Sequence, residues 1–288
     1  MPPALSISQC IDLHIHSTAS DGSFSISQII EAARNLGLRA ISITDHDTLE
    51  GSLEALGHFQ SSSPEILSGI ELSADFPSGT MHILGYMIRV DDSAFLNMLE
   101  RIQGARSERN LEIVKKLQAL GINLEYDEVI EASGGGQVGR PHFARVLISR
   151  GVVQSAEEAF SKYLRKGKPG YADRYRLKPA EAIEAISHAG GVPVLAHPFT
   201  LEAESQGALE EIVVELKANG LKGIEVYCPD PNPEDRTKYE RLAWRYGLLM
   251  TGGTDFHGAA KPDVHLGVGK GDLRIPYSLV ENLKACRS

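Results

Sequence analysis

The sequence predicts an α/β fold in which a mainly parallel sheet of seven strands closes into a barrel. Three observations lead to this prediction. Short apolar runs rich in β-branched residues recur along the chain, segments with helical periodicity separate them, and the hydrophobic fraction of 42% is that of an ordinary globular protein. A parallel strand needs a crossover connection, which is usually a helix, so alternating strands and helices favour a parallel sheet. Seven such units are enough to close a barrel.

The expected strands lie at both ends of the chain and leave its middle free. They are residues 10–15, 40–43, 65–67, 81–84, 192–196, 223–227 and 248–250. Residues 26–36 form a typical intervening helix, because Ser25 and Gln28 make a capping box at its start and Gly37 provides a stop at its end.

The alternation of strands and helices breaks between residues 91 and 173. No strand pattern is found there, and helical patterns cover residues 93–120, 126–132, 141–149 and 156–164. We therefore expect residues 1–90 and 174–288 to form the barrel, and residues 91–173 to form a helical insertion domain that caps its mouth. An unrelated helical bundle attached to the barrel remains an alternative.

The charge balance and the cysteines exclude several classes of protein. The 29 lysines and arginines against 38 aspartates and glutamates give a net charge of −9, which disfavours a broad nucleic-acid-coating surface. Cys10, Cys228 and Cys286 form no CxxC pair, so no disulfide framework or structural zinc finger is expected. Residues 1–9 lack a targeting pattern and no apolar run approaches a membrane span, so we expect a cytoplasmic protein without a membrane partner.

Histidines and carboxylates gather where the expected strands end. A single His-x-His pair, such as His14 and His16, occurs by chance, but comparable groups recur at nearly every strand terminus. Parallel strands of a barrel end on one rim, where active sites are built. We therefore expect a common hollow to be lined by nine groups: His14, His16, Asp21, His46, Glu71, His82, His197, Asp255 and His257.

These nine groups predict a centre with more than one metal ion. One tetrahedral ion takes about four ligands, so six imidazoles and three carboxylates require two or three divalent ions. A shared carboxylate holds two ions roughly 3.5–4 Å apart, which suits in-line attack at phosphorus. Without metal, so many clustered ionisable groups are costly to desolvate together.

A possible anion site lies in the central segment. Arg140, Pro141 and His142 mark a helix start, and a helix N-terminus with an adjacent arginine attracts anions. A plain surface helix start is the other interpretation. His58, His188 and His265 lie in polar surroundings, and we expect them to be solvated.

Several sequence blocks together resemble the motifs of the PHP (polymerase and histidinol phosphatase) family. The resemblance spans nearly the whole chain and implies a distorted seven-stranded (β/α) barrel with a two- or three-metal phosphoesterase centre. The blocks are DLHIHS at 12–17, DG at 21–22, TDHD at 44–47, GIELS at 69–73, AHP at 196–198 and GGTDFH at 252–257.

The resemblance also implies a ligand assignment. One ion is held by His14, His16, Glu71 and Asp255, which are the expected catalytic residues, a second by Glu71, His82 and His197, and a third by Asp21, His46 and His257. Asp45 and Glu225 are expected to orient ligating histidines. Imidazole and carboxylate suit Mn²⁺, Zn²⁺ or Fe²⁺, and the resemblance favours Mn²⁺.

The central segment resembles one branch of the family. RPHFAR at 140–145, KYL at 162–164 and GKPGY at 167–171 are similar to stand-alone bacterial 3′,5′-nucleoside bisphosphate phosphatases and to RNase AM-type 5′-3′ exoribonucleases. This resemblance implies that Arg140, His142 and Lys168 hold the phosphate that is not cleaved.

The expected reaction is attack of a metal-bound hydroxide on the 3′-phosphate of a small nucleotide such as adenosine 3′,5′-bisphosphate. Trimming of short 5′-phosphorylated RNA is expected from the same centre, and no DNA duplex is expected as a partner. Two alternatives stay open. One is a histidinol-phosphate phosphatase, which needs an acidic group for the substrate amine. The other is a non-catalytic PHP interaction module, although such modules often lose part of the metal set.

Overall fold

The computed structural model describes residues 10–58, 64–229, 232, 234–271 and 273–287. Residues 1–9, where we expected no targeting signal, lie outside this range. The strands are β1 (Ile11–Ile15), β2 (Ala40–Ile43), β3 (Glu65–Ala74), β4 (Met81–Tyr86), β5 (Val192–Leu195), β6 (Gly223–Tyr227) and β7 (Leu249–Gly252). The α-helices are α1 (Ile26–Leu36), α2 (Glu50–Gly57), α3 (Ser93–Ala119), α4 (Tyr126–Ser133), α5 (Arg140–Ser149), α6 (Ala156–Ala159), α7 (Pro179–His188), α8 (Gln206–Ala218), α9 (Asp235–Tyr246) and α10 (Ser278–Arg287).

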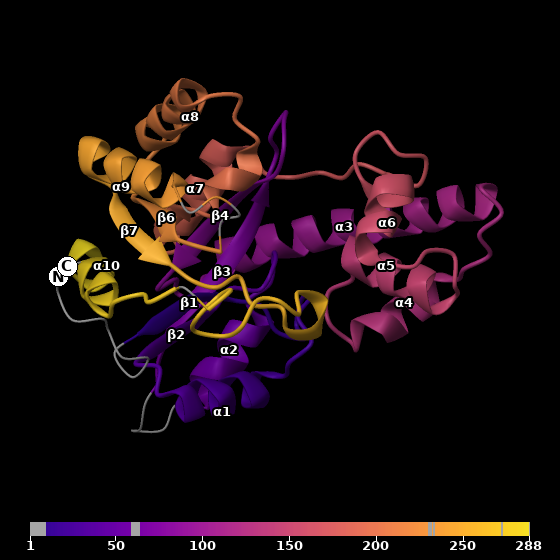
Figure 1. The fold of residues 1–288 in the computed structure, drawn as a ribbon, viewed down its shortest axis with the longest axis horizontal. Helices are drawn as coiled ribbons and strands as arrows, with labels where there is room; N and C mark the ends of the chain where they lie inside the picture. Colours follow the sequence, from indigo (N-terminus) through magenta and orange to yellow (C-terminus); the bar gives the residue numbers. More distant parts are fainter. Residues whose placement is uncertain (1–9, 59–63, 230–231, 233, 272, 288) are drawn as a thin grey trace.

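The seven strands form one curled sheet in the order of the sequence (Figure 1). Strands β1 to β3 run parallel, and so do β5 to β7. The segment after β7 returns to β1, where the His16 amide donates to the Phe256 carbonyl at 2.9 Å. The predicted α/β fold with a distorted seven-stranded barrel is therefore confirmed.

Strand β4 departs from the expected parallel arrangement, because it runs antiparallel to both β3 and β5. The connection between β3 and β4, residues 75–80, is too short for a crossover helix, so these two strands form a hairpin. The reversal places the beginning of β4 at the rim where the parallel strands end. His82, the second residue of β4, reaches the common rim for this reason.

Strand β3 is longer than the sequence indicated. Its first residues, up to Ser68, pair with β2, and its residues from Gly69 onward pair with β4. One continuous strand therefore forms hydrogen bonds with two neighbours along different parts of its length. Glu71 consequently lies within β3 and not after it. It still lies beside the end of β2, because His46 forms an isolated parallel bridge to it.

A glycine allows the last strand to approach the first. A Cβ atom added to Gly253 would lie 2.2 Å from the Cβ of His14 and 2.3 Å from the His14 amide nitrogen. Real side chains do not tolerate such distances, so only glycine permits this approach. The approach brings the residues after β7 next to His14 in β1 and His16 directly after it.

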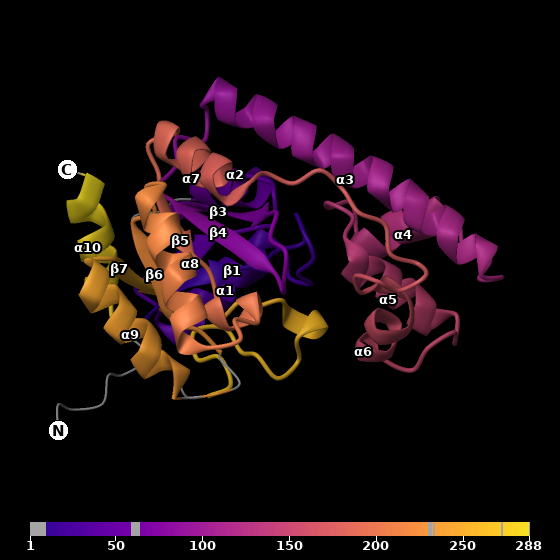
Figure 2. The same ribbon diagram turned by 90° about the horizontal axis from the view of Figure 1, so that it is seen from above.

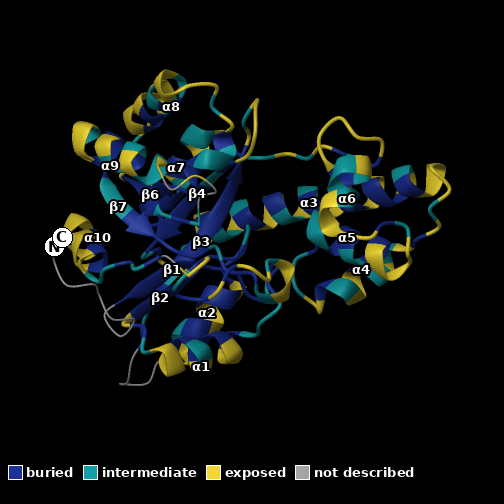
Figure 3. Ribbon diagram, in the orientation of Figure 1, coloured by how far each residue is buried: buried dark blue, intermediate teal, exposed yellow. Residues whose placement is uncertain are grey.

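The helices cover the sheet and bury its apolar side chains (Figure 3). Helix α1 has the predicted bounds, with the Ser25–Gln28 capping box formed and Gly37 in the left-handed conformation at φ 73°. Its residues Ile29 and Ala33 are fully buried against the sheet. Within the described residues, no helix combines the length and the apolarity that a membrane span requires.

Residues 91–173 contain no strand, and helices α3 to α6 fill this segment as predicted. Helix α6 changes after Ala159 into a π-helical turn, Phe160–Leu164. Helices α4 to α6 and the second half of α3 share an apolar cluster of their own to one side of the sheet (Figures 1 and 2). The first half of α3 instead packs into the core of the barrel through Phe95, Leu99 and Ile102. The loop before α5 rests on the rim of the barrel, where the Gln137 amide donates to the Ala19 carbonyl at 3.0 Å.

Candidate metal centre

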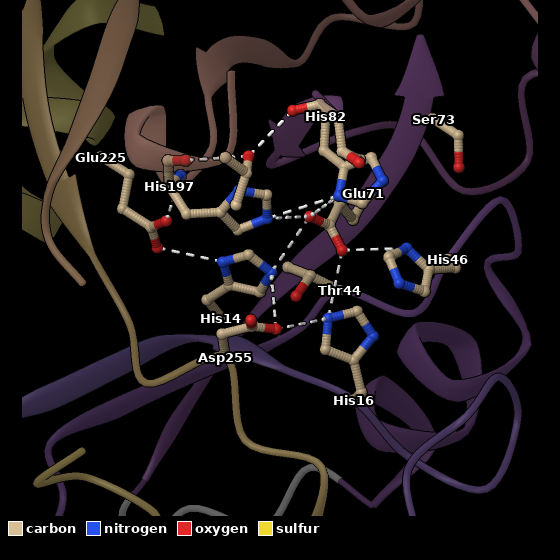
Figure 4. Close-up of polar contacts among 12 residues, drawn as sticks. His14, His16, Thr44, His46, Glu71, Ser73, His82, His197, Glu225 and Asp255 are labelled. Atoms are coloured by element: carbon tan, nitrogen blue, oxygen red, sulfur yellow. Dashed lines mark hydrogen bonds and ion pairs between the residues drawn. The ribbon is translucent and has the colours of Figure 1, made fainter. Parts of the chain in front are cut away.

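Glu71 lies at the centre of a cluster of buried histidines on the barrel rim (Figure 4). Its Oε1 atom is 2.8 Å from His82 Nδ1 and 2.9 Å from His197 Nε2. Its Oε2 atom is 2.9 Å from His46 Nδ1 and 3.1 Å from His16 Nε2. Residues from β4 and from the segments after β1, β2 and β5 therefore meet at this carboxylate of β3.

Asp255 and Asp21 extend the cluster on either side of His16. Asp255 Oδ1 lies 3.3 Å from His16 Nε2 and 3.6 Å from His14 Nε2. Asp21 Oδ1 lies 3.3 Å from His257 Nε2, and the rings of His16 and His257 stack with centroids 4.1 Å apart. All nine side chains predicted from the strand ends thus lie in one continuous cluster.

The donor atoms of this cluster fit bound cations. Among the described residues, four of its buried atoms make no hydrogen bond: His14 Nε2, His16 Nε2, His46 Nδ1 and Glu71 Oε2. These atoms lie close to one another without forming a hydrogen bond, and a buried polar atom that makes none costs roughly 1–3 kcal/mol. Neutral imidazole nitrogens and carboxylate oxygens are ligands for divalent transition metals, which would satisfy these atoms.

Four groups of these side chains have ligand atoms close enough to share an ion. They are His16, Asp21, His46 and His257; His14, His16 and Asp255; His14, Glu71 and His197; and His46, Glu71 and His82. The groups overlap in His14, His16, His46 and Glu71. The ligands expected for the third ion, Asp21, His46 and His257, are all contained in the first group. Glu71 belongs to both the third and the fourth group. The division of ligands among ions stays a prediction.

The carboxylates of the cluster are held in their ionised form. Burial by itself raises the pKa of Glu71, but the imidazoles of His82, His46 and His14 bring it well below its ordinary value. Burial likewise opposes ionisation of Asp255, and Lys261 and His257 outweigh it, so the pKa of Asp255 also lies well below its usual range. Ionised carboxylates are the form that binds a cation.

Glu225 and Asp45 form hydrogen bonds with cluster residues or with the loop that carries them. Glu225 Oε1 lies 3.0 Å from His14 Nδ1, and its Oε2 accepts the backbone N–H of His197 at 2.7 Å. Asp45 acts less directly, because its carboxylate accepts the Ser17 amide at 2.7 Å and the Ser20 hydroxyl at 2.6 Å. Glu225 therefore orients a cluster histidine itself, whereas Asp45 fixes the loop after β1.

A cavity of about 820 Å³ opens from the cluster toward helices α3 to α6. Asp21, His46 and His82 line its barrel end. Arginines line it on the helical side: Arg106, Arg109, Arg140, Arg165, Arg174 and Arg176. The cavity therefore joins the candidate metal centre to a strongly cationic wall.

Of the three predicted phosphate contacts, only Arg140 lines the cavity. Its guanidinium donates to the Leu164 carbonyl at 3.2 Å. His142 is fully buried, and its Nδ1 accepts the Gly139 amide at 2.9 Å. Lys168 is exposed on the loop after the π-helical turn. Neither His142 nor Lys168 is part of the cavity wall.

The sequence analysis missed the other five arginines of the wall, of which four form two closely spaced pairs. Arg106 and Arg109 are three residues apart and so share a face of α3. Arg174 and Arg176 are two residues apart in the extended segment that returns to the barrel, a spacing that places them on one side. These spacings were visible in the sequence, but only the packing of α3 against that segment directs them into one cavity.

Comparisons with known proteins agree with this geometry. The PHP domain family matches residues 12–172 of the chain. The chain is 33% identical to the 3′,5′-nucleoside bisphosphate phosphatase of Chromobacterium violaceum over 86% of its own length and 87% of that protein. It is 32% identical to a 5′-3′ exoribonuclease of Haemophilus influenzae over 85% and 89% of the two chains. A solved structure from Bifidobacterium adolescentis, provisionally named a metal-dependent phosphoesterase, superposes with a TM-score of 0.84, 30% identity and coverage of 100% and 98%.

Proposed function

The chain belongs to the PHP-domain family, and on this premise we propose that it hydrolyses the 3′-phosphate of nucleoside 3′,5′-bisphosphates. The coarser activity follows from its relatives: it is a metal-dependent phosphoesterase. One observation carries the finer proposal. A single cavity connects the His/carboxylate cluster with the arginine wall, so it can receive a phosphate at each end.

The charge of the cavity wall supports a substrate with a second phosphate. Arg109 is buried, and its burial together with the charges of Arg106 and Arg140 lowers its pKa. Such crowding of like charges is unfavourable unless an anion neutralises it. Guanidinium groups bind phosphate oxygens in pairs, which provides orientation as well as affinity.

The residues of the cluster have distinct tasks in this proposal. Divalent ions held there would supply an activated water and offset charge on the phosphate. Glu71 connects the ligand groups, Glu225 keeps the His14 ring in its orientation, and the arginine wall holds the substrate so that its 3′-phosphate faces the cluster. We propose Mn²⁺ as the metal, and the donor set accepts Zn²⁺ or Fe²⁺ as well.

Trimming of short 5′-phosphorylated RNA is a second candidate activity of the same centre. A cavity of about 280 Å³ adjoins the large one and shares Arg106 and Gln137 with it, which offers room beyond one nucleotide. The net charge of −9 favours short chains over long RNA. We propose the cytoplasm as the location, where the thiols of Cys10, Cys228 and Cys286 stay reduced.

Histidinol phosphate fits the cavity less well. Its amine needs a carboxylate, and the wall offers Asp75, Asp173 and Glu202. Asp173 is already paired with Arg176 at 2.7 Å. Arginines and lysines outnumber these acids along the wall: Arg106, Arg109, Arg140, Arg165, Lys166, Arg174 and Arg176.

A comparison of kcat/KM among three substrates tests the proposed function. The manganese-loaded protein is assayed with adenosine 3′,5′-bisphosphate, histidinol phosphate and a short 5′-phosphorylated RNA. We expect kcat/KM for the bisphosphate to exceed that for histidinol phosphate by about 100-fold, which corresponds to about 2.8 kcal/mol of transition-state binding. A preference for histidinol phosphate would overturn the proposal, and absence of hydrolysis on all three substrates would favour a non-catalytic module.

A further inference from the structure

Asp47 is a buried carboxylate that lies next to the metal cluster but is not part of it. It follows His46 directly, is fully buried, and has a left-handed backbone conformation at φ 53°. Its amide donates to the Glu71 carbonyl at 2.9 Å, which fixes this unusual conformation. A non-glycine residue persists in this region only where the surroundings impose it.

The Asp47 side chain is fully hydrogen-bonded. Oδ1 accepts the Ser73 amide at 2.8 Å, and Oδ2 accepts the Ser73 hydroxyl at 3.0 Å. Oδ2 also accepts the Arg174 guanidinium at 2.9 Å and is paired with Arg106. One carboxylate of the barrel therefore binds two arginines of the cavity wall.

The two arginines come from different parts of the chain. Arg106 belongs to α3, which leaves the barrel, and Arg174 belongs to the segment that returns to it. Their side chains are 10% and 4% exposed, respectively, and both line the large cavity. Without a shared anion they would repel each other.

Fixing these arginines in advance favours anion binding. A free arginine side chain loses conformational entropy when it is immobilised. A guanidinium that is already held by a buried carboxylate loses less of this entropy when a ligand binds. The Asp47 carboxylate is such an anchor, because it is fully buried and pairs with both Arg174 and Arg106.

We propose that Asp47 is a positioning residue that holds Arg106 and Arg174 in the orientation that binds the second, uncleaved phosphate of the substrate. The inference rests on the proposed function. It assigns to Asp47 the preference for substrates that carry two phosphates.

Two effects of removing the Asp47 charge have opposite signs, so experiment can separate them. Loss of the anchor frees both arginines and weakens binding of the second phosphate. Loss of a negative charge near the cavity makes the wall more cationic and strengthens anion binding. The positioning role requires that the first effect exceed the second.

The test compares Asp47→Asn with the wild type on two substrates. For adenosine 3′,5′-bisphosphate we expect kcat/KM to fall about 10-fold or more, mainly through KM. For adenosine 3′-monophosphate, which lacks the second phosphate, we expect a change within about twofold. An equal loss on both substrates would mean that Asp47 has only a structural role and would overturn the proposal.

Gln103→Ala is the matched control. Gln103 is on the same face of α3 and donates to the Asp47 carbonyl at 3.0 Å, so its loss disturbs the same junction without changing the charge or the arginines. We expect kcat/KM to stay within about twofold for both substrates. A Gln103→Ala profile that matches that of Asp47→Asn would contradict a specific effect of the carboxylate.

Binding of adenosine 5′-monophosphate provides a readout that does not depend on turnover. This ligand is the nucleotide product of the proposed reaction, which also releases inorganic phosphate. Calorimetry on the manganese-loaded proteins is expected to give a Kd about 10-fold weaker for Asp47→Asn and unchanged for Gln103→Ala. Tighter binding by Asp47→Asn would overturn the proposal. If the wild type binds this ligand but does not hydrolyse the bisphosphate, the proposed function is wrong. The comparison of Kd between the wild type and Asp47→Asn would still be valid.

Ser73→Ala is a second variant in case Asp47→Asn does not fold. It removes one hydroxyl donor from the Asp47 carboxylate and leaves the charge and the Ser73 amide in place. We expect the same selective loss on the bisphosphate, but smaller, about threefold. A loss on the monophosphate of equal size would count against the role of Asp47.

Discussion

Glu71 is the single side chain on which the candidate metal centre depends most. It is fully buried and lies within 3.4 Å of ring nitrogens of five histidines: His14, His16, His46, His82 and His197. For Glu71→Gln we expect kcat to fall by about 1000-fold or more, roughly 4 kcal/mol, because a neutral amide cannot connect the ligand groups. Steady-state kinetics and elemental analysis measure activity and metal content. The exposed Glu54→Gln is the control, and full metal content with full activity in Glu71→Gln would refute the assignment.

Glu225 is expected to act through His14. In Glu225→Gln the amide can keep one of the two contacts, but the negative charge beside His14 Nδ1 is lost. Loss of a partner that orients a ligating histidine typically lowers metal affinity 10–100-fold. Manganese titration of the metal-depleted variant measures this change. An affinity equal to that of the wild type would show that His14 needs no such support.

His142 makes the stability of the protein depend on pH. Burial, reinforced by the charges of Arg145 and Arg106, lowers its pKa to about 4. The unfolded chain binds this proton near pH 6.5, so the neutral His142 stabilises the fold fully above that pH, and this contribution is lost as the pH falls toward 4. The total is on the order of 3 kcal/mol.

The variant His142→Gln isolates this contribution, because its amide oxygen can still accept the Gly139 amide. Denaturant unfolding at a series of pH values is expected to show a smaller loss of stability between pH 7 and pH 4.5 in the variant than in the wild type. Identical pH profiles would mean that His142 does not titrate with a lowered pKa in the folded protein.

At the scale of elements, the junction between β7 and β1 controls the site. Gly253→Ala introduces a Cβ 2.2 Å from the Cβ of His14, so β7 must move away from β1 or the His14 backbone must shift. We expect a loss of several kcal/mol in stability together with weaker metal binding, measured by thermal unfolding and manganese titration. In Gly57→Ala, where the added Cβ meets no atom within 4 Å, stability should rise slightly or stay the same. A Gly253→Ala variant as stable as Gly57→Ala would contradict the close approach.

The element boundaries could be predicted where a local signal marks them. The helix at 26–36 has its capping box and terminal glycine in the sequence, and its bounds agree with the structure. Strand β3 has no such signal at Leu67, because the residues that extend it to Ala74 do so by pairing with β4. The direction of β4 is likewise a property of the hairpin and the sheet.

At the scale of the whole molecule, bound metal is expected to stabilise the fold. A ligand that binds only the folded state adds RT ln(1 + [L]/Kd), about 4.1 kcal/mol at a thousandfold excess over Kd. Treatment with a chelator should therefore lower the Tm measured by differential scanning fluorimetry, and added Mn²⁺ should restore it. Glu71→Gln should show little response to either treatment. A wild-type Tm that is the same with and without chelator would argue against a metal centre in the folded protein.

The division of the chain into a barrel and an inserted domain stays a prediction at the limits 91 and 173. Two observations favour it. Helices α4 to α6 and the second half of α3 have an apolar cluster of their own, and the loop before α5 contacts the barrel rim through Gln137. Against the limit at residue 91, Phe95, Leu99 and Ile102 in the first half of α3 pack into the core of the barrel. The cavity lies between these two parts and takes its lining from both.

The order of strands and helices, the family, and the nine histidines and carboxylates of the cluster could all be predicted from the amino-acid sequence. This was possible because backbone periodicity and the alternation of side chains along a strand are local properties. The central position of Glu71, the reversal of β4, and the pairing of Asp47 with both Arg106 and Arg174 emerged only from the folded chain. These features depend on distances between segments far apart in the chain, and such distances are set by packing and by the pairing of buried charges.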